Sequence, residues 1–203
     1  MQNNGAFRLE KLAEADFPSR FGHFRIHGFV GHYPNRMEES AVLSMGDYAS
    51  GEPPLVRIHS QCLTGDVFHS LRCDCGLQLE LALEKIADAG CGLLIYEHQE
   101  GRGIGLMNKL KAYALQDEGA DTVEANEMLG FEADLRDYQL PTSILVAMGV
   151  KRLKLMSNNP EKIDAISRAG IEVTERVPMI VEFGEHSDDY LRTKKEKMGH
   201  LLG

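Results

Sequence analysis

The sequence has few cysteines, a shortage of basic residues and no long apolar run. Four cysteines in 203 residues are too few for the disulfide framework of a small secreted domain. No stretch approaches the ~20 apolar residues of a membrane span, and the first residues lack the apolar core of a signal peptide. We therefore expect a cytoplasmic protein with no membrane partner, in which thiols stay reduced and can bind a metal ion.

The charge balance is acidic, with 22 basic and 31 acidic residues and a net charge of −9. This balance argues against nucleic acid as a partner, because sequence-independent binding depends on a basic field. A small anion can still bind where a few Arg and Lys side chains converge. The length suits one well-filled core, and the chain shows no repeat, low-complexity tract or linker. We therefore expect a single domain over residues 1–203.

Three of the four cysteines lie close together in the pattern C-x10-C-x-C, at Cys62, Cys73 and Cys75. Thiolates suit zinc, and three protein ligands with a fourth position open to water are typical of a catalytic zinc site. The alternative is three buried thiols that act as small hydrophobic groups. The charged neighbours of Cys73 favour zinc. Cys91 begins an apolar run and is interpreted as a core residue.

The remaining pattern alternates between strands and helices. A βαβ unit over residues 55–96 predicts a layered α/β fold, and Phe7 and Leu9 are expected to add an edge strand. In the helix that ends near Gly119, the expected apolar face is Leu106, Leu110 and Ala114. The predicted strands cover residues 24–30, 41–45, 55–60, 91–96, 152–156 and 171–175, with the first two antiparallel. The predicted helices cover residues 77–90, 106–119, 121–130, 140–148 and 160–170, with a further one from Tyr190.

Two turns have the character of anion sites. The glycine-rich turn at 97–106 precedes a helix, where backbone N–H groups can approach a phosphate; alternatively, its glycines only shape the turn. Ser157 to Pro160 supply an N-cap followed by proline at the first helical position, with Lys162 in the first turn. The charged loop at 131–138 would ordinarily be interpreted as solvated surface.

Five motifs in a fixed order resemble the GTP cyclohydrolase II family, the zinc enzymes that open riboflavin biosynthesis. They are Arg-Ile-His-Ser-Gln-Cys-Leu-Thr-Gly-Asp at 57–66, Arg-Cys-Asp-Cys-Gly at 72–76, Gln-Glu-Gly-Arg-Gly-Ile-Gly at 99–105, Gln-x-x-Gly-Ala-Asp-Thr-Val-Glu-Ala-Asn at 116–126 and Ser-Asn-Asn-Pro at 157–160. The resemblance covers residues 24–202. It implies a three-layer α/β/α fold with a mixed sheet, a homodimer, and magnesium beside one zinc per subunit. The short N-terminal part suggests the single-function form, without a fused dihydroxybutanone phosphate synthase.

The implied reaction is the hydrolysis of GTP to 2,5-diamino-6-(5-phosphoribosylamino)pyrimidin-4(3H)-one, formate and pyrophosphate. By resemblance, Cys62, Cys73 and Cys75 hold zinc. The residues that would bind GTP are Arg57, Ile58, His59, Ser60, Gln61, Gln78, Glu100, Gly101, Arg102, Thr122, Ser157 and Lys162. The sequence leaves open whether the Glu100 carboxylate accepts from the guanine edge or holds magnesium.

The resemblance also gives the charged loop a role. It implies that Asp134 is the general base and that Arg136 acts at the α-phosphorus, as a nucleophile in the family's description. A guanidinium with pKa above 12 is a poor nucleophile, so stabilisation of transition-state charge is the alternative for Arg136. Tyr113 matches a tyrosine near the family's metal site and would steer the ring-opening water.

Two positions depart from the family pattern. Gln61 replaces a common glutamate, which removes a charge but keeps a carbonyl acceptor, and Ser157 replaces a threonine and keeps the hydroxyl. The histidines near the motifs, His59, His69 and His98, show no ligand spacing, so a structural role is favoured for each. The rival functions are a paralogue that retains the formyl group or the pyrophosphate, and a non-catalytic zinc or nucleotide-binding protein.

Overall fold

The computed structural model describes residues 6–49, 51–132 and 134–181. Within them, seven strands form one mixed sheet in the order β1-β2-β3-β5-β4-β6-β7. The strands β1 to β3 and β5 are joined by antiparallel pairing, whereas β4 is parallel to both β5 and β6, and β6 is parallel to β7. The strands are β1 (Arg8–Ser19), β2 (Gly22–His32), β3 (Met37–Met45), β4 (Leu55–Ser60), β5 (Gly92–Glu97), β6 (Arg152–Met156) and β7 (Glu172–Val177).

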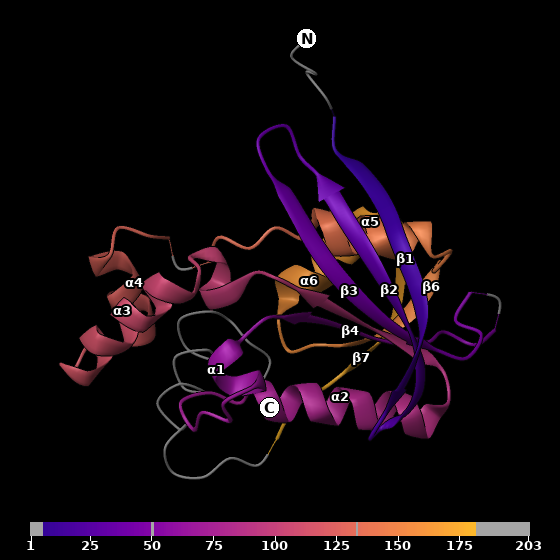
Figure 1. The fold of residues 1–203 in the computed structure, drawn as a ribbon, viewed down its shortest axis with the longest axis horizontal. Coiled ribbons are helices and arrows are strands. Elements are labelled where there is room, and N and C mark those ends of the chain that lie inside the picture. The colour runs from indigo at the N-terminus through magenta and orange to yellow at the C-terminus, as the bar shows by residue number, and fades with distance from the viewer. Residues whose placement is uncertain (1–5, 50, 133, 182–203) are drawn as a thin grey trace.

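Helices cover both faces of the parallel half of this sheet (Figure 1). The helix α2 lies on one face, and α5 and α6 lie on the other, which confirms the expected α/β class with three layers and a mixed sheet. The helices are α1 (Leu63–Asp66), α2 (Cys75–Ala89), a 3-10 turn η1 (Glu100–Gly103), α3 (Leu106–Asp117), α4 (Thr122–Met128), α5 (Gln139–Ala147) and α6 (Pro160–Arg168). No helix among the described residues is long and apolar enough to cross a membrane.

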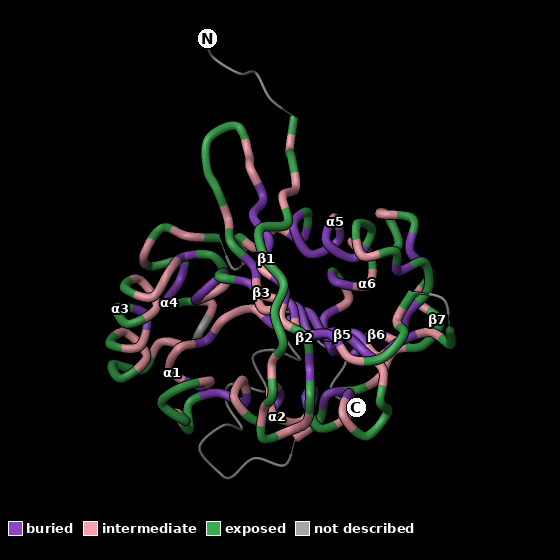
Figure 2. The backbone as a smooth tube through the Cα atoms, turned by 45° about the vertical axis from the view of Figure 1, so that its right-hand side comes forward, coloured by how far each residue is buried: buried purple, intermediate pink, exposed green. Residues whose placement is uncertain are grey.

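The central strand β5 shows how the two cores are separated. Its side chains alternate, so Leu93 and Ile95 enter the core beneath α5 and α6, whereas Leu94 enters the core beneath α2. Both faces are buried, which explains why the sequence of β5 is a continuous apolar run. The buried parts of the tube in Figure 2 concentrate along these central strands.

The predicted edge strand exists, but it is longer than Phe7 and Leu9 indicate. The strand β1 pairs with β2 from Arg8 opposite His32 to Ser19 opposite Gly22. Most of its side chains are exposed and many are charged. An edge strand of this kind lacks the apolar alternation on which strand prediction depends, and its charges protect the edge from pairing with other chains.

The predicted apolar face of α3 is wrong. Leu110 is 43% exposed and Ala114 is exposed, whereas Ala112 is buried. The reason is that α3 does not pack on the sheet; with α4 it projects to one side (Figure 1). The helix predicted from Tyr190 and the end of the family resemblance lie outside the described residues. Whether residues 1–203 form a single domain stays a prediction.

Candidate active site

The candidate site lies at the carboxyl ends of the parallel strands, where ligands bind in open α/β sheets. A cavity there is lined from the ends of β4, β5 and β6, the start of α2, and one face of α3. It brings together fourteen of the predicted site residues, which are Arg57, Ser60, Gln61, Cys62, Cys73, Cys75, Gln78, Glu100, Gly101, Arg102, Tyr113, Arg136, Ser157 and Lys162. Three predicted residues do not line it, namely Ile58, His59 and Asp134, and the side chain of Thr122 lies outside the described part of the structure.

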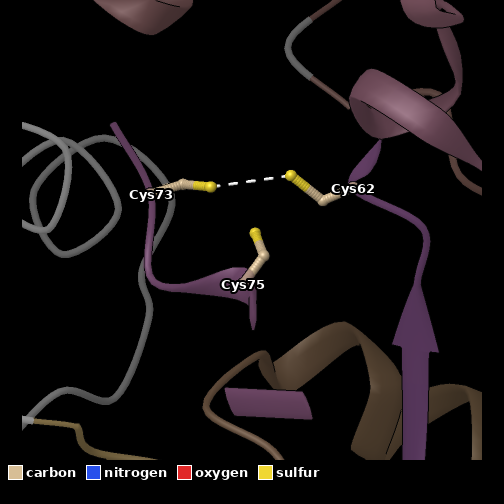
Figure 3. A group of neighbouring side chains, drawn as sticks. All are labelled: Cys62, Cys73 and Cys75. Carbon is tan, nitrogen blue, oxygen red and sulfur yellow. Dashed lines mark hydrogen bonds between the residues drawn. The ribbon is translucent and has the colours of Figure 1, made fainter. Parts of the chain in front are cut away.

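The three predicted metal ligands line the cavity, and their sulfurs point toward one another (Figure 3). Cys62 follows β4, and Cys73 and Cys75 lie at the start of α2. The sulfurs of Cys62 and Cys73 are 3.5 Å apart, and the three sulfurs all lie within 4.8 Å of one another. Tetrahedral zinc with Zn–S bonds of about 2.3 Å places sulfurs about 3.8 Å apart. The cluster therefore fits a zinc ion.

Two glycines allow this convergence. A Cβ on Gly65 would lie 2.9 Å from the Cys73 sulfur and 3.2 Å from the Cys62 sulfur. A Cβ on Gly76 would lie 2.4 Å from the carbonyl oxygen of Gly65. The two backbone segments approach so closely because neither residue has a side chain.

A buried polar network holds the loop that carries Cys62. The carboxylate of Asp66 accepts from the backbone N of Cys62 at 3.0 Å and from the Tyr96 hydroxyl at 2.8 Å. His59 Nε2 lies 3.1 Å from both Asp66 oxygens, and its ring stacks on Tyr96. Burial lowers the pKa of His59. His59 thus contacts the loop that carries Cys62 through Asp66, which agrees with a structural role for this histidine.

Lys109 is a site residue that the sequence reasoning missed. Its Nζ donates to the Cys62 sulfur at 3.0 Å, to Thr64 Oγ1 at 3.0 Å and to Glu100 Oε1 at 2.7 Å. Lys109, Tyr113 and Gln116 all line the cavity, and they stand at i, i+4 and i+7 on α3. That polar stripe was a signal in the sequence, but the apolar spacing on the same helix competes with it.

The cavity wall is strongly basic in an acidic protein. Among the described residues, six basic side chains line it, namely Arg57, Arg72, Arg102, Lys109, Arg136 and Lys162, against one carboxylate, that of Glu100. Arg57 is held by the Gln78 Oε1 acceptor at 2.6 Å and the Met156 carbonyl at 2.9 Å. Burial lowers the pKa of Arg57 to about 10. Such a concentration of donors is typical of a polyanion site.

Lys162 and Arg102 occupy this wall in different ways. Lys162 is buried and donates to the carbonyl oxygen of Ile58 at 2.8 Å; the Ile58 side chain itself lies in the core. Burial, then the charges of Arg136 and Arg57, lower the pKa of Lys162. Arg102 has a left-handed backbone (φ 61°). Its two terminal guanidinium nitrogens are buried and have no hydrogen-bond partner among the described residues, so they are available to an anion.

Two residues of the charged loop, Asp134 and Arg136, form an ion pair beside the cavity, and Arg136 lines it. Arg136 Nε donates to the Asp134 oxygens at 2.9 and 3.0 Å, and Arg136 Nη2 also donates to Asp134. Burial raises the pKa of Asp134, but the hydrogen bonds and charge of Arg136, together with the charge of Arg102, outweigh it, and the net shift is downward. Burial likewise lowers the pKa of Arg136, and the hydrogen bond to Asp134, together with the charges of Tyr138, Asp134 and Glu97, reverses that shift. In this pairing Asp134 is a weak base.

The turn after β6 has the predicted cap. Asn159 is the N-cap of α6 and accepts from the backbone N of Glu161 at 2.9 Å, with Pro160 in the first turn. Ser157 Oγ accepts from the Asn159 backbone N at 3.0 Å. Thr122 is the first residue of α4.

Comparison with known proteins agrees with this geometry. The family model for GTP cyclohydrolase II matches residues 10–178. The chain belongs to the GTP cyclohydrolase II family. It is 53% identical over 194 residues to the GTP cyclohydrolase-2 of Teredinibacter turnerae, covering 96% of both chains. It is 54% identical over 192 residues to that of Pseudomonas putida, covering 95% of this chain and 93% of the relative.

A third relative, the GTP cyclohydrolase-2 of Histophilus somni, is 50% identical over 195 residues, which cover 96% of this chain and 89% of the relative. The chain is therefore an enzyme of the GTP cyclohydrolase II kind. Among solved structures, the two-domain 3,4-dihydroxy-2-butanone 4-phosphate synthase RibBX from A. baumannii overlaps with a TM-score of 0.47 and 16% identity, over 89% of this chain and 42% of that one. No functional conclusion follows from so weak a likeness.

Proposed function

We propose that this chain is a zinc-dependent GTP cyclohydrolase II that releases formate and pyrophosphate from GTP and forms 2,5-diamino-6-(5-phosphoribosylamino)pyrimidin-4(3H)-one. One observation carries the proposal: three convergent thiols lie at one end of a cavity whose wall, in the part of the chain that the structure describes, holds six basic side chains and one carboxylate. The thiols would hold one zinc ion, and the basic wall would receive the triphosphate.

Different residues would act at the two ends of the cavity. A bound zinc ion would supply Lewis acidity, which activates water near neutral pH. Arg57, Arg102 and Lys162 would bind the triphosphate. Tyr113, whose hydroxyl lies 3.3 Å from Thr64 Oγ1, would orient the attacking water at the thiol end.

The Asp134–Arg136 pair would act in the release of pyrophosphate. The triphosphate would compete for the Arg136 guanidinium, and Asp134 would then be released to accept a proton from water. This exchange favours charge stabilisation over covalent attack as the role of Arg136, because its raised pKa keeps the guanidinium protonated.

Magnesium would enter the site bound to the phosphates of GTP. Gln61 supplies an amide where relatives of this family commonly have glutamate, and Glu100, the one carboxylate of the wall among the described residues, is already bonded to Lys109. Mg2+ binds through carboxylates and substrate phosphates, so we propose that the phosphates are its main ligands here. The homodimer and the cytoplasmic location stay predictions.

The test is to incubate the purified protein with GTP, Zn2+ and Mg2+ and to measure formate, pyrophosphate and product absorbance together. We expect all three to appear in equal amounts. Cys73→Ser should abolish zinc retention and formate release, whereas Cys91→Ser, outside the cluster, should change neither. Release of only one small product would indicate the paralogue, and tight GTP binding without turnover would indicate a non-catalytic protein.

A further inference from the structure

Lys109 joins the two functional groups at the metal end of the cavity. The same Nζ that donates to the Cys62 sulfur at 3.0 Å also donates to Glu100 at 2.7 Å. The second Glu100 oxygen, Oε2, accepts from the backbone N of Leu63, the residue after Cys62, at 2.7 Å. Lys109 and Glu100 therefore hold the Cys62 segment through its side chain and its backbone at once.

The position of Lys109 is fixed by its surroundings. Its side chain is 12% exposed, and its backbone N donates to Gly105, the N-cap of α3, at 3.1 Å. A Cβ on Gly101 would lie 3.1 Å from Lys109 Cβ, so the glycine turn packs directly on the start of the lysine side chain. These contacts fix the position of the Lys109 ammonium group within the site.

The charges around Lys109 explain why its contacts with Cys62 and Glu100 matter. Three thiolates and one Zn2+ leave a net charge of −1, and Glu100 adds another negative charge nearby. Cys62 is 5% exposed and Glu100 is 7% exposed, so water compensates little of this charge, and buried charges are stable only when paired. Lys109 supplies the one ammonium that contacts both groups in the described part of the chain.

We propose that Lys109 is a positioning residue that holds the Cys62 sulfur and the Glu100 carboxylate in one hydrogen-bonded unit, so that retention of the metal depends on it. The inference rests on the proposed zinc site. Residues that bond to metal ligands typically change metal affinity by 10- to 100-fold when they are removed.

The experiment measures the zinc dissociation constant by competition with a chromophoric chelator at fixed pH. Lys109→Met should weaken zinc binding by about 10- to 100-fold, and Lys109→Arg should recover part of the loss because it keeps a charged N–H donor. Lys111→Met is the matched control, since Lys111 lies on the exposed side of the same helix, and it should bind zinc like the wild type.

A double variant separates loss of the sulfur contact from an orphaned carboxylate. Glu100→Gln with Lys109→Met removes both buried charges, and it should still bind zinc about 10- to 100-fold more weakly than Glu100→Gln alone. It also carries the test if Lys109→Met fails to fold, which circular dichroism in EDTA would show. Zinc affinity within about twofold of the matching parent in either comparison overturns the role of Lys109. A wild-type protein that holds no zinc overturns the metal site itself, and with it the proposed function.

Discussion

Gly65→Ala should disable the metal site while leaving the rest of the fold in place. The added methyl carbon would lie 2.9 Å from the Cys73 sulfur, 3.2 Å from the Cys62 sulfur and 3.1 Å from the Cys75 Cβ. Non-bonded heavy atoms are comfortable at about 3.5–4.0 Å, so the Cys73 sulfur must retreat by about 0.6 Å or more. The methyl has no free side to turn to, because all three cysteines surround it.

A displacement of that size matters because a zinc site tolerates about 0.2 Å in its ligand distances. We expect zinc affinity to fall by at least about 10-fold, comparable to or beyond the loss of a supporting residue. The metal-free protein should lose only about 1–3 kcal/mol of unfolding free energy, the usual cost of overpacking.

The assay combines chelator competition for zinc with urea unfolding in EDTA. Gly28→Ala is the matched control, since a Cβ there meets nothing within 4 Å, and it should retain wild-type zinc affinity. If Gly65→Ala binds zinc as tightly as the wild type, the sulfurs are not arranged around this glycine as described, and the reasoning fails.

Three further predictions concern the polar groups around the cavity. Burial raises the pKa of Glu97 to about 8, from an ordinary value of 4.5. Between these two pH values the folded state keeps a proton on Glu97 that the unfolded state has lost. The unfolding free energy should therefore fall as the pH rises from about 5 to 8. Glu97→Gln should flatten that decline in urea titrations, and an unchanged slope would contradict it. The Gln99 side chain holds the Asp137 backbone: its Nε2 donates to the Asp137 carbonyl oxygen at 2.7 Å, and its Oε1 accepts from the Asp137 backbone N at 3.1 Å. Gln99→Met should slow pyrophosphate release about 10- to 100-fold with a smaller change in KM. Changes of equal size in the rate and in KM would contradict a positioning role. Glu100→Ala should reduce the preference for GTP over ATP by about 10-fold or more if its carboxylate contacts guanine, and retained preference would exclude that contact.

The thiol cluster was predictable from the sequence because the information is local. Cys73 and Cys75 are separated by one residue, and Cys62 follows a strand whose end is fixed by the sheet. Soft ligands concentrated in that way favour zinc over an ordinary hydrophobic core. Their convergence depends on no long-range detail beyond the βαβ unit, which the apolar run of β5 and the Gly90 helix end already indicate.

The supporting residues could not be predicted in the same way. Lys109 lies 47 residues from Cys62 along the chain, and the apolar spacing of Leu106 and Leu110 predicts that its helix packs on the sheet. The hydrophobic pattern of a helix predicts packing only when the helix covers a core, and α3 instead covers a polar cavity. The same limit applies to β1, where charged residues form an edge strand that only the pairing with β2 defines.

The turn at 99–103 joins the two halves of the chemistry. Toward the metal end, Glu100 holds the Leu63 backbone and Lys109. Toward the phosphate end, Arg102 accepts through its carbonyl oxygen from the backbone N of Leu135 at 3.0 Å, and Gln99 clamps the same loop. Because one short turn contacts both groups, a substitution that displaces the turn should disturb the Cys62 segment and the Asp134–Arg136 loop together. Under the proposed function, the ring-opening and phosphate steps should therefore respond jointly to substitutions here, although they would use different residues.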